Sequence, residues 1–264
     1  MNSLRHIWVG VAVLSWSLPV WAGANQSEMV LVPAGAYSPF FARQADKGTE
    51  VQKRPQSVPM KSFWLDRYPV TNVQYLAFVR QHPEWQKSKI KTIFADSHYL
   101  EGWANDTSWG EDGKRTQPIT SVSWFAANAF CRVHGKSLPT TDQWEYALAD
   151  DGRAKDSINA KILEWYGKLN SAGITPVEQS DKNGYGIHGL VGLVWEWTLD
   201  FNSVLSGAEL RQTGKDKELF CGGANLNASD ASDYAAFMRF SMRSSLKAPY
   251  TTPNMGFRCA KEKS

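Results

Sequence analysis

The side chains with the greatest chemical potential are three cysteines, Cys131, Cys221 and Cys259. No two of them form a C-x-x-C pair, and the histidines are scattered without an i, i+4 pair. Because compact zinc sites need cysteine or histidine ligands at short spacings, the sequence predicts no local metal motif. In an oxidising compartment two of three cysteines usually pair and the third stays a thiol.

A polar stretch near the C-terminus indicates a second kind of chemistry, the binding of another molecule through hydrogen bonds. It contains Asn225, Asn227 and Tyr234 among serines and aspartates. Short hydrogen-bonding side chains with a tyrosine suit a binding surface. A plain solvated loop has the same composition, so both interpretations stay open.

Three arginines in the same part of the chain are further binding candidates, because a guanidinium group holds a carboxylate or a peptide backbone through paired donors. They are Arg239, Arg243 and Arg258. The alternative role is buried structural pairing with a carboxylate, for which the candidates are Glu145, Glu196 and Asp200.

Two tryptophans flank a glutamate in the run Trp195, Glu196, Trp197. In a strand, successive side chains point to opposite faces, so both indoles are expected on one face and the carboxylate on the other. Core packing is one interpretation of the tryptophans. A cleft that binds a ligand through Trp195 and Glu196 is the other.

The elements that must position these residues are short. Residues 29–35 predict a short apolar strand that ends in a turn at its proline and glycine, and residues 62–68 alternate as a strand does. Capping boxes that start at Thr71 and Thr140, each with a glutamine three residues later, predict the start of two helices.

A further helix is expected over 123–131, with Gly135 as its stop. Residues 84–118 show no clear period and predict a long loop or insertion. Short elements between long loops rich in glycine and tryptophan indicate one irregular α+β domain.

Residues 1–24 predict an export signal. Arg5 is their only formal charge, residues 7–20 are almost entirely apolar, and small residues at 22–24 form a cleavage site. A membrane anchor is the alternative, although spanning a bilayer takes about 20 apolar residues. We therefore expect a mature domain over 25–264, periplasmic or secreted, without a membrane span once the signal is removed.

The charge of the chain argues against one class of partner. Lysine and arginine total 29 against 26 aspartate and glutamate, a net charge of +3, and no basic run is present. A nucleic-acid-binding groove is therefore not expected.

Several short motifs occur in a fixed order along the chain. They read Met-Val-Leu-Val-Pro-Ala-Gly at 29–35, Tyr-Pro-Val-Thr-Asn at 68–72, Gly-Lys-Ser-Leu-Pro-Thr at 135–140, Gly-Leu-Val-Trp-Glu-Trp at 192–197 and Gly-Phe-Arg-Cys at 256–259. The ordered set resembles the formylglycine-generating enzyme, or sulfatase-modifying factor, family. The resemblance implies a variant of the C-type-lectin fold with little regular secondary structure.

The resemblance also implies a chemistry, and the sequence departs from it. In family enzymes two cysteines near the C-terminus bind one copper ion and use oxygen to oxidise a substrate cysteine to formylglycine, since thiolates are soft ligands for Cu(I). Counting back from Gly256, those positions fall at about Asn227 and Ala235. The copper site is therefore expected to be lost. The family's calcium site uses an asparagine that is Leu193 here, and an alkyl side chain offers no oxygen to calcium.

Cys131 and Cys259 match positions that are bridged in the family, so the resemblance implies a disulfide between them. Cys221 is then left over. It is either a buried, inert thiol or a single thiolate that acts as a metal ligand or mixed-disulfide site.

Three functions remain open. The first is a relative without ordinary formylglycine-generating activity that binds another exported protein and assists its maturation. A copper or respiratory enzyme is the expected partner, because some family members are associated with periplasmic metalloenzymes. The second is a divergent metal-dependent oxidase that uses Cys221 or an added cofactor. The third is a lectin-like binder, which only the fold suggests. The missing cysteine pair and Leu193 favour the first.

Overall fold

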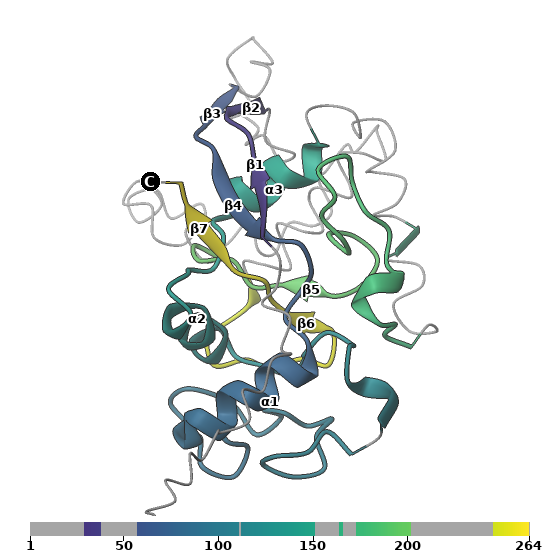
Figure 1. The fold of residues 1–264 in the computed structure, drawn as a ribbon. Coiled ribbons are helices and arrows are strands. Elements are labelled where there is room, and N and C mark those ends of the chain that lie inside the picture. The colour runs from purple at the N-terminus through teal and green to yellow at the C-terminus, as the bar shows by residue number, and fades with distance from the viewer. Residues whose placement is uncertain are drawn as a thin grey trace, which may run out of the picture.

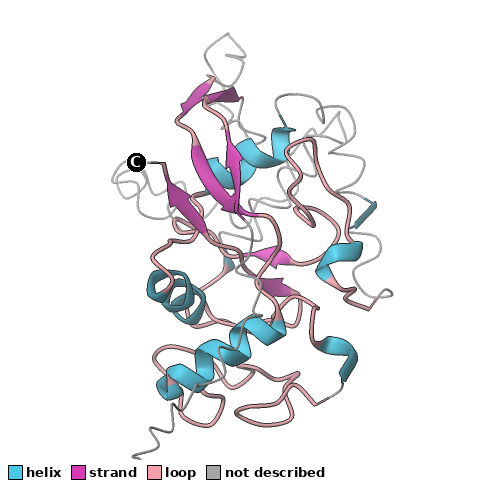
Figure 2. Ribbon diagram, viewed as in Figure 1, coloured by secondary structure: helices cyan, strands magenta, loops and turns pink. Residues whose placement is uncertain are grey.

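The computed structural model describes residues 29–37, 57–110, 112–150, 164–165, 173–201 and 245–263. In this part of the chain, short helices and strands are joined by long irregular segments, as expected for a single irregular α+β domain (Figure 2). None of the helices described there has the length and apolar character needed to cross a bilayer.

A three-stranded antiparallel sheet joins segments from both ends of the described chain (Figure 1). Its central strand is β4 (Phe63–Asp66), with β1 (Met29–Val32) on one side and β7 (Ala260–Glu262) on the other. Val32 and Leu65 on its inner face are fully buried in a core that also contains residues of α3.

The short strand expected within 29–35 is present, and the chain turns after it, but a further strand starts at Gly35. β1 ends at Val32, and after Pro33 a second strand, β2 (Gly35–Tyr37), pairs with β3 (Val58–Met60). Proline lacks the N–H that an antiparallel ladder uses, which accounts for the break. The glycine therefore begins a new strand instead of ending the first one.

Both capping boxes start helices, as predicted. α1 (Asn72–Gln81) follows Thr71, and α3 (Thr141–Ala149) follows Thr140. In each box the glutamine side chain accepts the threonine N–H at 2.9 Å. At each helix start, the backbone N–H of the threonine is thus satisfied by a side chain only three positions further along the chain.

α2 (Trp124–Val133) is capped by Ser123, whose hydroxyl accepts the N–H of Ala126 at 3.2 Å. The helix ends before Gly135, which has a φ of 67°. A left-handed residue at this position is a common helix stop, and glycine adopts it without steric cost.

The expected long loop over 84–118 begins within one short 3-10 helix, η1 (Pro83–Trp85), and contains another, η2 (Asp112–Lys114). It also contributes to the core, because the Tyr99 hydroxyl lies 2.6 Å from that of Tyr75 on α1. Both rings are buried, and this burial raises the pKa of each phenol above its usual value.

A two-stranded parallel pair, β5 (Trp195–Glu196) and β6 (Met255–Gly256), lies below the sheet in Figure 1. η4 (Val177–Gln179) precedes it in the chain. Gly256 lies so close to the backbone that a Cβ there would be 2.6 Å from the carbonyl oxygen of Ile119. The pair packs into the larger core with α1 and α2.

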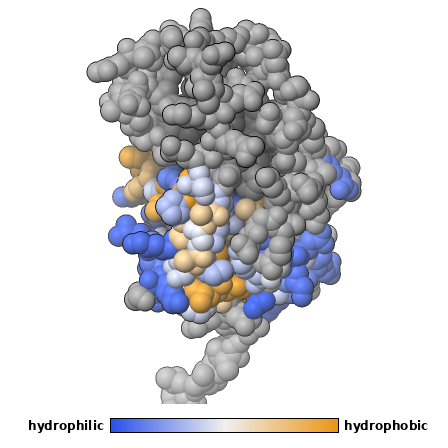
Figure 3. Space-filling view, turned by 90° about the horizontal axis from the view of Figure 1, so that it is seen from above, coloured by the Kyte–Doolittle hydropathy of each residue, from blue (hydrophilic) through white to orange (hydrophobic). Residues whose placement is uncertain are grey.

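The described surface seen from above is hydrophilic along its sides, with a few apolar patches between them (Figure 3). Among the large apolar side chains of the described residues, Ile93 is the most exposed at 69%.

Candidate functional site

Most of the site residues expected from the sequence lie outside the described part of the chain. They are Cys221, Asn225, Asn227, Tyr234, Arg239 and Arg243. Trp195 and Glu196 lie on β5, two residues after Leu193. The described part of the site therefore consists of β5 and the residues that contact it.

Glu196 forms an ion pair with Arg258, and both side chains are completely buried. Nε of the arginine donates to one carboxylate oxygen at 2.7 Å, and Nη2 donates to the other at 2.7 Å. The indole nitrogen of Trp144 on α3 donates to the first of these oxygens at 2.8 Å. Paired bonds between arginine and carboxylate are both strong and directional. Arg258 therefore has the structural role that the sequence left open, with Glu196 as its partner.

The other donors of Arg258 hold backbone carbonyls. Nη2 donates to His188 at 2.7 Å, and Nη1 donates to Asp66 at 3.2 Å and to Arg67 at 3.3 Å. A guanidinium group has five N–H donors, and this arginine makes five hydrogen bonds. It ties the end of β4 and the segment around residue 188 to β5. Both oxygens of Glu196 are engaged in this frame, so we interpret Glu196 as a support of the site and not as a ligand-binding group.

The two tryptophans beside Glu196 are buried. Trp197 is 1% exposed, and its indole nitrogen donates to the Val122 carbonyl at 2.8 Å. Trp195 is 9% exposed, and the centroid of its ring lies 4.6 Å from that of Trp165. Core packing accounts for Trp197. Because Trp165 is only partly buried, the pair formed by Trp195 and Trp165 connects the core to the surface.

Leu193 packs as an ordinary apolar residue. It is 8% exposed, and its Cδ2 would lie 2.8 Å from a Cβ placed on Gly189, which has a φ of +64°. Calcium requires oxygen ligands, and this side chain provides none. The described residues also contain no group of three or more histidine, cysteine, aspartate or glutamate side chains arranged to hold a metal ion.

Cys131 on α2 and Cys259 next to β7 form a disulfide with a Cα–Cα distance of 5.6 Å, the pairing that the resemblance implies. Both are fully buried. The chain has three cysteines in total, so Cys221 is the one cysteine outside this bond.

Comparison with known proteins places the chain in a family. A model described as the sulfatase-modifying factor enzyme 1-like domain matches residues 19–263. The chain belongs to this family. The formylglycine-generating enzyme of Streptomyces coelicolor is 31% identical over 288 residues, which cover 88% of each chain.

Relatives in the sulfatase-modifying factor family include proteins named as active and as inactive. Mouse formylglycine-generating enzyme is 24% identical and covers 89% of this chain and 75% of its own length. Mouse inactive C-alpha-formylglycine-generating enzyme 2 is also 24% identical and covers 90% and 86%. Among solved structures, PvdO from Pseudomonas aeruginosa is 19% identical, covers 89% of this chain and 94% of its own, and has a TM-score of 0.50, which supports the fold alone. Overall identity therefore does not separate the two kinds of relative.

Two supports of the site were not expected from the sequence. Trp144 lies in the helix predicted to start after Thr140, and its position there does not indicate that it donates to Glu196. Asp66 was expected only as part of a strand, yet its buried carboxylate accepts the Cys259 N–H at 3.0 Å and pairs with Lys136 at 2.6 Å. A charged residue within an apolar strand segment was the available signal, because a buried carboxylate needs a partner.

Proposed function

We propose that this member of the sulfatase-modifying factor family does not convert cysteine to formylglycine. It uses the segment that replaces the family's redox cysteines to bind part of another exported protein and to assist the maturation of that protein. A copper or respiratory enzyme is the partner we expect. The observation that carries the proposal is the number of cysteines that remain once the disulfide has formed.

A copper site made of two thiolates requires two free cysteines in one chain. Of the three cysteines, two form the buried bond between α2 and the segment preceding β7. One thiol remains, and the positions that match the family's pair fall at about Asn227 and Ala235. An amide and a methyl group are not ligands for Cu(I). The residues present therefore do not fit the family's copper ion.

The binding role is supported by composition. Asn225, Asn227 and Tyr234 supply hydrogen-bonding groups where the family has its cysteines, and Arg239 and Arg243 follow them. Arg258 has the structural role that was the alternative for these arginines, because all of its N–H donors form hydrogen bonds within the protein. Because identity to relatives of both kinds is similar, the proposed loss of oxidation chemistry rests on the cysteine positions and not on overall similarity.

The direct test is an activity assay. The purified chain is incubated in air with copper and a cysteine-containing sulfatase peptide, and the peptide is analysed by mass spectrometry for the aldehyde product. Streptomyces coelicolor formylglycine-generating enzyme serves as the positive control. We expect no aldehyde from this chain. Formation of the aldehyde at a rate comparable with the control overturns the proposal.

A second candidate function, a divergent oxidase centred on Cys221, is favoured by one observation: this cysteine is the one thiol left and precedes the pair Gly222 and Gly223. Thiol titration of the unfolded chain without reductant should give one thiol, and titration after reduction should give three. Metal analysis of the wild type and of Cys221→Ser separates the candidates. Stoichiometric copper or iron that disappears in the variant supports the oxidase, and metal-free protein in both supports the binding role.

A further inference from the structure

One row of side chains on the three-stranded sheet faces away from the core. Leu31 of β1 is paired with Trp64 of β4, and Trp64 is paired with Lys261 of β7. Directly paired residues lie on the same face of a sheet, and the neighbouring residues Val32 and Phe63 point into the core. Leu31 and Trp64 are each 36% exposed, and Lys261 is exposed. The row is therefore apolar and accessible in its middle and basic at one end.

The next row on the same face is covered by the fold. It contains Asp66, which is buried and bonded to Nζ of Lys136, a residue that follows α2. Cys259 donates its N–H to the same carboxylate and is bridged to Cys131. The disulfide and the segment after α2 thus close one half of the face, while the row around Trp64 keeps its exposure.

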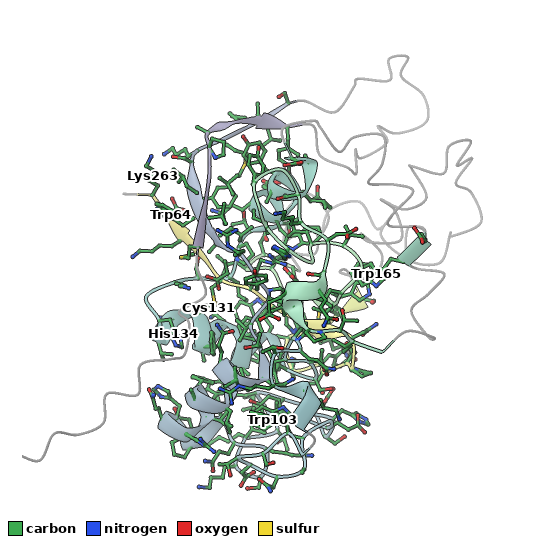
Figure 4. All side chains as sticks on the ribbon, turned by 45° about the vertical axis from the view of Figure 1, so that its right-hand side comes forward. Trp64, Trp103, Cys131, His134, Trp165 and Lys263 are labelled. Atoms are coloured by element: carbon green, nitrogen blue, oxygen red, sulfur yellow. A yellow bond between two sulfur atoms is a disulfide. The ribbon has the colours of Figure 1, made fainter. Side chains whose placement is uncertain are left out.

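A hollow of about 400 Å³ lies over the open row and extends to Met29, which is paired with Asp66 in the next row. Its lining residues are Met29, Trp64, Lys261, Glu262 and Lys263. In Figure 4, Trp64 and Lys263 are next to each other at the margin of the molecule, on the side of the sheet. A hollow with an indole in its wall accepts a protruding side chain. A membrane-binding surface instead needs apolar side chains that themselves protrude into the lipid.

The charges around the hollow define the partner. Lys261 on β7 and Lys263 just after it both line the hollow, and Glu262 between them contributes one opposite charge. The lining therefore carries a net charge of +1. Lysine stems cover apolar surface while their ammonium groups stay in water, where they meet carboxylates. We propose that this hollow docks a segment of a partner protein that places an apolar or aromatic side chain against Trp64 and a neighbouring carboxylate against the two lysines.

This docking surface is separate from the segment on which the proposed function rests. It consists of β1, β4 and the end of the chain from β7 to Lys263, and it shares no residue with 221–243. The aldehyde assay and the thiol titration do not depend on the surface. The two proposals can therefore fail independently.

A peptide selection tests the docking proposal. Random heptapeptides displayed on phage are selected on the purified chain, and enriched peptides are synthesised and titrated by fluorescence polarisation. We expect an aspartate or glutamate next to an apolar or aromatic residue. The affinity should fall about tenfold or more in Trp64→Ala and in the double variant Lys261→Glu/Lys263→Glu, because the first removes the apolar anchor and the second reverses the charge.

The chain offers a matched control for the charge reversal. Lys89 and Lys91 are also exposed and two residues apart, but they lie in the segment after η1. Lys89→Glu/Lys91→Glu should leave peptide affinity unchanged. The double lysine variants change only exposed side chains, and a near-ultraviolet circular dichroism spectrum equal to the wild type shows that each remains folded.

Three outcomes overturn the docking proposal. One is enrichment of peptides without carboxylates, or no enrichment at all. Another is equal affinity of the wild type and both variants at the hollow. The third is binding to phosphatidylglycerol vesicles that Trp64→Ala abolishes and that the peptides do not inhibit, because the surface would then bind an anionic lipid.

Discussion

Replacing Glu196 by glutamine tests the buried ion pair that supports β5. The change keeps the size of the side chain and removes its charge, so Arg258 keeps its three carbonyl partners but loses its counter-ion. Breaking a buried pair in this way costs about 3–5 kcal/mol, because one charge stays buried without compensation. We expect the free energy of unfolding of Glu196→Gln to fall by this amount.

The measurement is urea unfolding at pH 7, followed by tryptophan fluorescence with the disulfide intact. With a urea dependence of about 3 kcal/mol per molar, the midpoint should fall by about 1–1.7 M. Glu101→Gln is the matched control. The Glu101 side chain is 59% exposed and pairs with His98 at 3.2 Å, and a surface pair of this kind contributes about 0–1 kcal/mol. A midpoint shift no larger than that of the control would refute the buried pair.

Three further predictions concern the rest of the fold. Replacing both bridge cysteines by alanine removes a crosslink between residues 128 positions apart. Calorimetry should show that the free energy of unfolding falls by a value approaching about 5 kcal/mol, the upper value of the chain-entropy model. An unchanged melting temperature would contradict this prediction. The buried phenols of Tyr75 and Tyr99 have a pKa raised above the usual 10.0, so their contribution to stability is complete below pH 10 and is lost as the pH rises further. The urea midpoint should therefore fall as the pH rises above 10, and the fall should be smaller when both tyrosines are replaced by phenylalanine. Gly256→Ala places a Cβ against the Ile119 carbonyl, and urea unfolding should show a free energy of unfolding lower by about 1–3 kcal/mol. Gly102→Ala is the control, because a Cβ there has no atom within 4 Å, and its free energy of unfolding should differ little from the wild type.

The helices could be predicted from the sequence because their signals are local. Each capping box joins residues three positions apart, so the starts after Thr71 and Thr140 do not depend on the rest of the fold. The sheet depends on distant residues. The hydrogen bond from Cys259 to Asp66, which lies in β4, joins residues 193 positions apart. No short pattern in the strand predicts that partner or the register in which it pairs.

The candidate site shows the same limit. The composition offered three carboxylates for three arginines, and each combination was possible from the sequence. Arg258 reaches Glu196 across 62 residues because β5 and β6 are parallel neighbours and Arg258 follows β6 by two residues. The tertiary fold therefore selects the pair. The cysteine pairing came from the family resemblance and not from spacing, and the structure contains that pair.

The frame of this fold and the chemistry of its family depend on different residues. Glu196, Arg258 and Trp144 hold the buried polar network, and the disulfide joins α2 to the last strand. None of these residues belongs to the segment 221–243, where the family's redox cysteines would fall. Replacing a thiol pair there removes none of these described buried partners, so the charges of Glu196 and Arg258 stay paired. The proposed loss of oxidation chemistry is therefore compatible with retention of this frame.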